Sequence, residues 1–250
     1  MTEWISGNVI KIKNWTEKLF SIVLNAPISP FIAGQFAKLK LKNSKNMSIQ
    51  RAYSYVNAPN NKNLEFYLVE AKSGKFSPLL RALKPGENIL ITKYASGSFT
   101  LETVPSCKNL WMIATGTAIG PYLSILQYGK NLKRFENIIL VHAVRFYQDL
   151  SYLKKIMQLK EIYKQKLFFQ KIISREKVFN TLYGRIPELI INGKLEDSLN
   201  VEINSQNSHV MLCGNPNMVR DTYECLNKKY SMIKNYQKSP GHITSELYWK

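Results

Sequence analysis

Two patterns of hydrophobic and polar residues divide the chain. Over roughly the first hundred residues, short segments alternate apolar and polar positions, as expected for half-buried β-strands. Residues 7–12, 36–41 and 64–69 are examples of such segments. Turn-forming residues separate them at 33–34, 58–61, 73–74 and 84–87. A short helix is predicted over residues 77–83, and many short strands at this spacing predict an antiparallel barrel or sandwich.

The pattern changes after about residue 105. Continuous apolar runs, typical of strands buried on both faces, occupy residues 110–114, 138–143, 167–173 and 210–213. Helical patterns lie between them, over residues 122–128, 150–163 and 218–230. Alternating strands and helices predict a doubly wound parallel sheet. We therefore predict two domains, an antiparallel β-barrel over residues 1–105 and an α/β domain over residues 106–250.

Composition adds few constraints. The 250 residues suffice for two domains, and the net charge of +18 is compatible with an acidic protein partner, nucleic acid or an acidic membrane surface. Lys, Asn and Ile are abundant, as in proteins from AT-rich genomes, so a bias in composition is another explanation for that charge. The functional explanation and the compositional one both remain open. Three Cys and three His are scattered, which predicts neither disulfides nor a metal site. No apolar run is long enough to span a bilayer and no secretory pattern opens the chain, so we expect a cytoplasmic protein.

A turn rich in Gly and Thr, residues 114–121, follows the first buried strand and leads into a helical pattern. Such a turn lets backbone amides and a helix N-terminus approach a pyrophosphate. Pro121 suits the first turn of the helix because its missing N–H is not needed there. A tight strand-to-helix connection without a ligand is the alternative.

Two further segments lie in the first domain. Arg51 is followed by Tyr53 and Ser54, so a cation that can pair with phosphate stands beside a ring that can stack on a planar cofactor. Residues 74–78 are a candidate phosphate-binding turn at a helix start. An ordinary strand and a plain turn are the respective alternatives.

Arginines follow the predicted strands of the second domain. Arg145 comes just after the strand 138–143, Arg175 follows the strand 167–173, and Arg185 lies on the next loop. The carboxyl ends of strands in a doubly wound sheet share one edge, so these side chains can converge on a dianionic group. The 2′-phosphate of NADP is the natural candidate, and no acidic residue ends the second strand to hold an NAD ribose.

Together, in this order, these segments and the residues 213–216 and 246–248 resemble the ferredoxin/flavodoxin–NADP reductases, specifically the compact bacterial subclass. The resemblance implies a Greek-key barrel that binds FAD and an α/β domain that binds NADP. It implies catalytic or tuning roles for Ser54, Cys213 and Glu246. The FAD-binding residues that it implies are Arg51, Ala52, Tyr53, Ser54, Tyr67, Leu68, Val69, Lys75, Phe76, Ser77, Thr117, Tyr248 and Trp249.

The resemblance also implies a set of residues that hold NADP, namely Val144, Arg145, Ser174, Arg175, Arg185, Asn215 and Asp221. The implied reaction is hydride transfer from NADPH to flavin N5, followed by single-electron steps to flavodoxin or ferredoxin. Both carriers are acidic, and Lys38, Lys40 and Arg81 are candidates for a basic rim that receives them. We expect a monomer that binds neither nucleic acid nor membranes.

Two alternatives remain at this stage. An NADPH-dependent flavin or quinone reductase of the same superfamily would share the cofactor segments but donate electrons to small molecules. A basic nucleic-acid-binding protein would need aromatics interleaved with Lys and Arg on one surface, and it would leave the ordered cofactor segments without a purpose.

Overall fold

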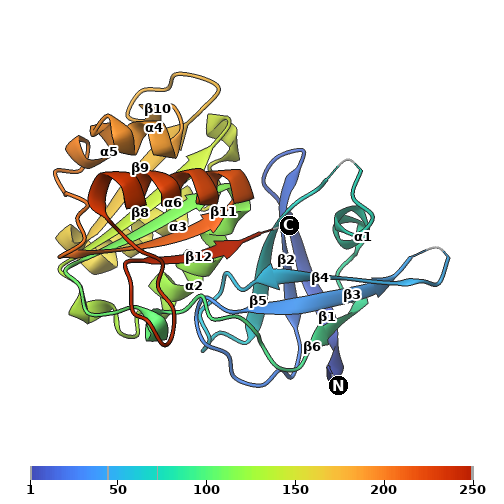
Figure 1. Cartoon of the computed structure of the whole chain (residues 1–250). Coiled ribbons are helices and arrows are strands. Elements are labelled where there is room, and N and C mark those ends of the chain that lie inside the picture. The colour runs from blue at the N-terminus through green and yellow to red at the C-terminus, as the bar shows by residue number, and fades with distance from the viewer. Residues whose placement is uncertain (1, 44, 72, 249–250) are drawn as a thin grey trace. The chain divides into compact units, whose positions relative to one another are not determined.

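The computed structural model describes residues 2–43, 45–71 and 73–248. They form two compact units (Figure 1), which are treated separately below. The first unit combines Met1–Thr100 with Gly120–Tyr128, and the second combines Leu101–Ile119 with Gly129–Lys250. Within the described residues, no helix is both long enough and apolar enough to cross a membrane.

The first unit is a six-stranded antiparallel sheet in the order β4-β3-β6-β1-β2-β5. Its strands are β1 (Trp4–Asn14), β2 (Leu19–Asn25), β3 (Phe36–Lys42), β4 (Ser48–Ser54), β5 (Asn63–Val69) and β6 (Asn88–Thr92). An antiparallel bridge between Tyr55 and Phe66 joins the two edges, and Val56 N donates to Glu65 O at 2.8 Å. The sheet thus curls into a Greek-key barrel, which confirms the fold predicted for this part of the chain.

The interior of the barrel follows directly from the alternation in the sequence. Phe20, Ile22 and Leu24 of β2 face inward, and their β5 partners Leu68, Phe66 and Leu64 do the same. Two helices belong to this unit, α1 (Ser77–Ala82) and α2 (Gly120–Tyr128). The helix α1 lies where the sequence predicts it, before the turn at 84–87.

The second unit is a six-stranded parallel sheet in the order β10-β9-β8-β7-β11-β12. Its strands are β7 (Asn109–Thr115), β8 (Asn137–Val144), β9 (Leu167–Ile173), β10 (Leu182–Tyr183), β11 (Ser208–Gly214) and β12 (Ile243–Leu247). Its α-helices are α3 (Leu153–Tyr163), α4 (Ile186–Ile191), α5 (Lys194–Asp197) and α6 (Pro216–Tyr230). Single 3-10 turns are η1 (Leu101–Thr103), η2 (Gly116–Ile119), η3 (Leu132–Arg134), η4 (Tyr147–Asp149) and η5 (Lys164–Lys166).

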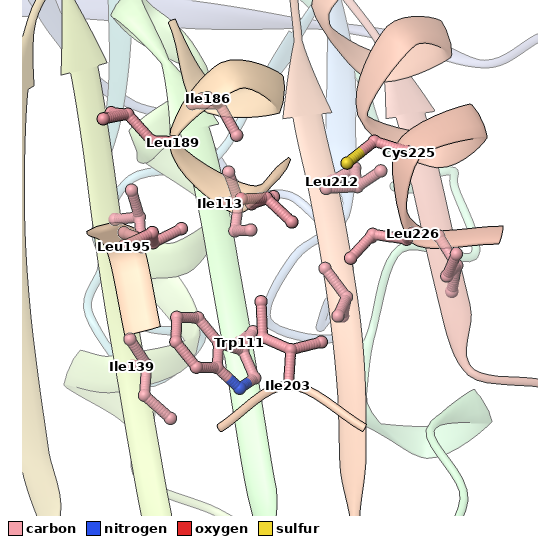
Figure 2. Close-up of a cluster of buried hydrophobic side chains, with 14 of the residues drawn as sticks. Trp111, Ile113, Ile139, Ile186, Leu189, Leu195, Ile203, Leu212, Cys225 and Leu226 are labelled. Atoms are coloured by element: carbon pink, nitrogen blue, oxygen red, sulfur yellow. The ribbon is translucent and has the colours of Figure 1, made fainter. Parts of the chain in front are cut away.

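One face of this sheet carries the larger core (Figure 2). Trp111 and Ile113 of β7 project to the same side as Ile139 of β8 and Leu212 of β11, because side chains on a strand alternate between faces. The helices α4, α5 and α6 cover them with Ile186, Leu189, Leu195, Cys225 and Leu226. On the opposite face, Val144 packs with Leu150 and with Leu153 at the start of α3. Helices on both faces confirm the doubly wound fold.

The structure corrects one helix boundary and adds elements that the sequence pattern did not predict. The predicted helix over 150–163 begins only at Leu153, because Tyr152 adopts a left-handed conformation at φ +64° and η4 precedes it. The short elements β10, α4, α5 and β12 were not predicted. Each has at most six residues, too few for a hydrophobic period to repeat several times.

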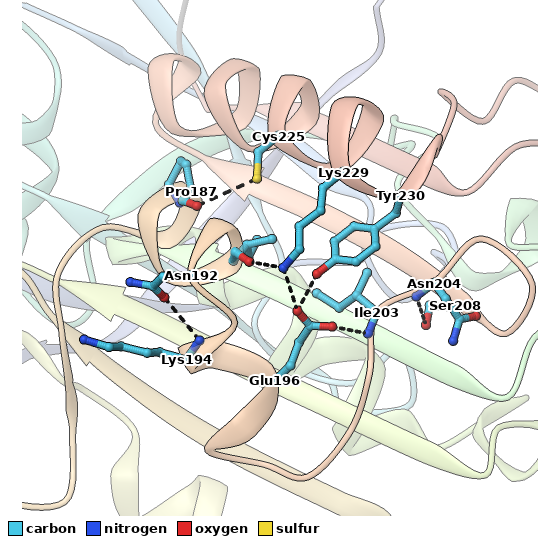
Figure 3. Close-up of polar contacts among 11 residues, drawn as sticks. Pro187, Asn192, Lys194, Glu196, Ile203, Asn204, Ser208, Cys225, Lys229 and Tyr230 are labelled. Carbon is cyan, nitrogen blue, oxygen red and sulfur yellow. Dashed lines mark hydrogen bonds and ion pairs between the residues drawn. The ribbon is translucent and has the colours of Figure 1, made fainter.

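A partly buried carboxylate joins the helices on one face of the second unit (Figure 3). Glu196 of α5 accepts hydrogen bonds from Ile203 N at 2.7 Å, from Lys229 Nζ at 3.4 Å and from the Tyr230 hydroxyl. Lys229 Nζ also donates to Ile190 O at 2.6 Å, which ties α6 to α4. Burial and the Glu196 carboxylate both raise the pKa of Tyr230, so the hydroxyl remains a donor.

Replacement Glu196→Ala should lower the free energy of unfolding by about 2–3 kcal/mol, because three donors lose their acceptor at a site shielded from water. Chemical denaturation measures this effect. The neighbouring Asp197→Ala, at an exposed position, is the matched control and should change stability by less than about 0.5 kcal/mol. Equal losses in the two variants would contradict the structural role of Glu196.

Candidate functional site

The order of strands in the second unit reverses between β7 and β11. The chain runs from β7 outward through β8, β9 and β10, and then returns to place β11 and β12 on the other side of β7. Ligands of doubly wound sheets bind at such a reversal, at the carboxyl ends of the strands. At this position Asn215 N donates to Thr115 Oγ1 at 3.0 Å. Gly214 is required beside it, because an added Cβ would lie 2.1 Å from the same oxygen.

The turn η2 leaves the carboxyl end of β7 and is held from two directions. His142 of β8 contacts Gly116 O through Nε2 at 2.9 Å, and the Tyr248 hydroxyl donates to Thr117 O at 3.3 Å. Gly116 has φ +56°, and a Cβ added to it would meet no described heavy atom within 4 Å other than those of its chain neighbours and its own helical turn. The sequence-predicted residues Thr117 and Tyr248 are thus brought together, and the outer side of the turn is open.

The three predicted arginines follow adjacent strand ends. Ser174 donates to Val144 O through its backbone N at 3.1 Å and its hydroxyl at 3.3 Å, and Arg175 N donates to Arg145 O at 3.0 Å. Gly184 N donates to Ile173 O at 3.1 Å, which brings Arg185 to the same edge. All three arginine side chains are exposed, and none of them forms an ion pair with an Asp or Glu that the structure describes. They are available to an anion.

Other predicted NADP-binding residues have their own intramolecular contacts. Asn215 Oδ1 caps α6, accepting from Asn217 N at 2.9 Å and from Met218 N at 3.4 Å. Asp221 pairs with Arg220 at 3.1 Å. The side chain of Val144 is buried, so only its backbone faces the strand end. The roles of these residues toward NADP stay predictions.

Cys213 and Glu246 are directly opposite each other in the β11–β12 ladder. Cys213 is fully buried, and burial followed by the Glu246 charge raises the pKa of its thiol well above the ordinary value. The thiol therefore stays protonated and neutral at physiological pH. This arrangement juxtaposes two of the three residues predicted to tune catalysis. Ser54, the third, is buried at the end of β4 in the first unit.

The strand β4 presents the other predicted cofactor segment. Arg51 and Tyr53 share one face of the strand, while Ala52 and Ser54 point to the other. Arg51 is exposed and pairs with none of the described Asp or Glu residues. Burial raises the pKa of Tyr53 to about 12, with Arg51 acting in the opposite direction. Arg51 donates only to Gln50 O at 2.8 Å among the hydrogen bonds described, and a cation without a carboxylate partner beside a half-buried ring fits a ligand with a phosphate and a planar aromatic system.

The residues around α1 form a compact turn next to that ring. Phe76 stacks on Tyr53 with centroids 6.2 Å apart and planes 16° apart. Ser77 Oγ accepts from Ala71 N at 3.0 Å, and a Cβ on Gly74 would lie 2.9 Å from Ala71 Cβ. Lys75 is exposed on this turn.

The remaining first-unit predictions differ in exposure. Tyr67, Leu68 and Phe76 are buried, and the last two belong to the barrel core, so their side chains are occupied by packing. Val69 is exposed. Trp249 lies outside the described residues.

Of the candidates for a basic rim, two have partners that reduce their availability. Arg81 pairs with Glu70 at 2.6 Å and also donates to Glu17 O, and Lys40 Nζ lies 4.0 Å from the centroid of the Trp4 ring. Lys38 shares the face of β3 that carries Lys40. Lys38 has no ion pair among the described residues, so its charge is more available to a partner than that of Arg81 or Lys40.

One residue of this site was missed by the sequence analysis. His142 interrupts an otherwise apolar run, 138–143, and was considered only as a metal ligand. A polar side chain inside a strand buried on both faces needs a hydrogen-bond partner, and that requirement is the signal that would have pointed to the adjacent turn.

Buried histidines predict an acid-labile fold. Burial lowers the pKa of His142 and of His209 from 6.5 to about 4. The unfolded chain therefore takes up these protons first, so stability is complete above about pH 6.5 and falls as the pH drops toward 4. Each histidine should contribute a slope of about 1.4 kcal/mol per pH unit in this window.

Urea unfolding between pH 7 and pH 4.5 measures this slope. The variant His142→Gln/His209→Gln should lose stability less steeply than the unmodified protein on acidification, because glutamine does not titrate. Identical pH dependence in both proteins would show that other groups control the acid transition.

The comparisons with known proteins agree with this geometry. Residues 112–224 match the model of the oxidoreductase NAD-binding domain family. The chain is 54% identical over 257 residues to the flavodoxin/ferredoxin–NADP reductase of Buchnera aphidicola subsp. Schizaphis graminum, with 100% of both chains covered. It is 53% identical over 249 residues to the enzyme of the same name from Escherichia coli K12, again with full coverage.

A solved structure is similar over the whole chain. It is the crystal structure of a ferredoxin NADP+ reductase from Neisseria gonorrhoeae with bound FAD and NADP. The TM-score is 0.93, the sequence identity is 31%, and each chain is covered completely.

Proposed function

Since the chain belongs to the flavodoxin/ferredoxin–NADP reductase family, we propose that it transfers electrons between NADPH and flavodoxin or ferredoxin through bound FAD. The barrel unit binds FAD and the α/β unit binds NADPH. The observation that carries this proposal is the carboxyl edge of the parallel sheet, where an open turn at the strand-order reversal lies on the same edge as three unpaired arginines.

NADPH is favoured over NADH by the chemistry of that edge. Arg145, Arg175 and Arg185 supply planar donors suited to the 2′-phosphate, which carries close to two negative charges. The backbone bonds between the loops after β8 and β9 hold Arg145 and Arg175 in neighbouring positions. The turn η2 receives the pyrophosphate, where small residues permit close approach of the backbone.

The barrel fits FAD in the same way. Arg51 neutralises the pyrophosphate, Tyr53 offers its ring to the isoalloxazine, and Ser54 lies one residue further along β4. The turn before α1, with Lys75 exposed, approaches the phosphates.

The protein's own residues orient the reactants. When bound, FAD supplies the conversion between a two-electron hydride donor and a one-electron carrier. Cys213 presents a neutral thiol beside Glu246, since burial keeps the thiol protonated. The carboxylate of Glu246 is the group at this point of the sheet that can hold a proton or orient the nicotinamide amide. Hydride transfer itself requires no general acid or base.

An acidic carrier is the electron partner that the charge favours. The net charge of +18 attracts acidic proteins at long range, and Lys38 contributes a partly exposed charge on the barrel. A cytoplasmic location and a monomeric state stay predictions from the sequence.

Anaerobic spectroscopy tests the proposal. The purified protein should be yellow, NADPH should bleach its flavin absorbance, and NADH should do so at least about a hundred times more slowly. Oxidised flavodoxin or ferredoxin should then restore the yellow colour.

A colourless protein that takes up no FAD would overturn the proposal. A protein that NADPH reduces, but that passes electrons only to free flavins or quinones, would instead be a small-molecule reductase of the same superfamily. Adding flavodoxin, ferredoxin, free flavin mononucleotide and a soluble quinone in separate experiments distinguishes these outcomes.

A further inference from the structure

His142 makes the contact between β8 and the turn η2. It lies on the sheet face opposite to the large core cluster, and its side chain is completely buried. Its Nε2 is 2.9 Å from Gly116 O. A carbonyl oxygen only accepts hydrogen bonds, so Nε2 carries the proton and Nδ1 does not. The contact therefore sets a single neutral tautomer.

The other ring nitrogen, Nδ1, gains no hydrogen bond that would offset the cost of burying the imidazole. Nδ1 is buried and has no hydrogen-bond partner among the described residues. Burying an unsatisfied polar atom is unfavourable, and a leucine of similar size would fill the same space without it. Packing alone therefore does not account for a histidine at this position, whereas the bond to Gly116 does.

The direction of the Gly116 carbonyl fixes the direction of the next amide. In a trans peptide the C=O of one residue and the N–H of the following residue point in opposite directions. Because Gly116 O points at buried His142, Thr117 N–H points away from it. Gly116 has φ +56° and open space where a side chain would be, so no side chain covers the backbone at Gly116 itself.

Contacts from three other strands surround this turn. Thr115 Oγ1 accepts from Asn215 N after β11, Gly116 O is held by His142 of β8, and Thr117 O accepts from Tyr248 after β12. Of these three contacts, only the one from His142 is made by a residue within a strand, since Asn215 and Tyr248 follow the ends of theirs. Its ring adds a side-chain bond to the carbonyl of the peptide between Gly116 and Thr117, in addition to the backbone bonding of the 3-10 turn η2.

We propose that His142 is a positioning residue for the dinucleotide pyrophosphate: its Nε2–H holds the Gly116 carbonyl inward, so that the Thr117 amide is presented to the phosphate. This inference rests on the proposed function, because it takes NADP(H) as the ligand of the turn. His142 does not touch the ligand itself.

Two ligands separate a positioning role from a merely structural one. NADP+ contains the pyrophosphate and the 2′-phosphate, whereas adenosine 2′-monophosphate contains only the latter and reaches only the arginines. In the FAD-loaded protein, His142→Leu should raise the calorimetric Kd for NADP+ about ten-fold and leave that for adenosine 2′-monophosphate within two-fold. His142→Gln retains a donor and should restore NADP+ binding to within about three-fold of the unmodified protein.

An unchanged Kd for NADP+ in His142→Leu would overturn the inference, and so would parallel weakening of both ligands. If the leucine variant does not fold, nitrogen NMR of the unmodified protein decides. The His142 Nε2 resonance should then shift on saturation with NADP+ but not with adenosine 2′-monophosphate, and equal responses to both would refute the role. Failure of the unmodified protein to prefer NADP+ over NAD+ would instead contradict the proposed function.

Discussion

The variant Arg175→Met should raise the KM for NADPH about fifty-fold and leave the KM for NADH nearly unchanged. A hydrogen bond to a charged group contributes about 1.5–3 kcal/mol, equivalent to about ten- to 150-fold in affinity. Arg175 has no carboxylate partner among the described residues, so its full contribution is available to the 2′-phosphate. Steady-state kinetics with the two nucleotides measures the effect, and Arg185→Met should behave in the same way.

The control removes one positive charge elsewhere on the same unit. Lys228 is exposed in the last turn of α6. That helix starts at the carboxyl edge of the sheet, so its last turn lies near the opposite edge. Lys228→Met should change the KM for NADPH by less than two-fold. If Arg175→Met raised the KM for NADH and NADPH equally, the arginine would contact a part shared by both nucleotides, and the assignment to the 2′-phosphate would be wrong.

Replacement Gly214→Ala should have the largest effect on the fold of the second unit. The new Cβ would lie 2.1 Å from Thr115 Oγ1 and 3.1 Å from Thr115 N, at a φ of +140°. Both the overlap and the backbone strain oppose this residue, so we expect a loss of about 3–5 kcal/mol in the free energy of unfolding. The contact between Asn215 N and Thr115 Oγ1 would be disrupted at the same time, so NADP+ should bind more weakly. Urea denaturation and calorimetric titration measure the two effects.

Gly193→Ala separates strain from overlap. Gly193 has φ +76°, and the nearest atom to an added Cβ is Asp197 Oδ2 at 3.7 Å, an ordinary contact. Gly193→Ala should lower the free energy of unfolding by only about 1 kcal/mol. The double variant Thr115→Ala/Gly214→Ala removes the closest atom and should recover part of the loss. Equal costs for the two glycine variants would mean that the close approach of β7 and β11 is not what requires Gly214.

Much of the fold is readable from the sequence, because the two hydrophobic periods differ so clearly. The alternation at 64–69 and the continuous run at 167–173 predict β5 and β9 almost to the residue. What the pattern does not contain is which strands pair. The segment that becomes β12 has no distinctive period, and only the structure places it beside β11.

The candidate site divides in the same way. Arg145 and Arg175 were predictable, since a residue that follows a buried parallel strand must lie at the carboxyl edge. The capping bond of Asn215 and the contact between His142 and Gly116 depend on neighbours far apart in sequence. No local pattern records them. A polar residue in a buried strand indicates that such a hydrogen bond exists, but it does not indicate which residue is the partner.

The pairing of β12 with β11 has a consequence for how the enzyme is made. The hydroxyl that reaches Thr117 belongs to a residue 131 positions later, and Glu246 meets Cys213 only through the same strand. A chain emerging from the ribosome can thus build the barrel and align the arginines while this part of the nucleotide site is still incomplete. The contacts of β12 with β11 and with Thr117 can therefore form only after this last strand has been made.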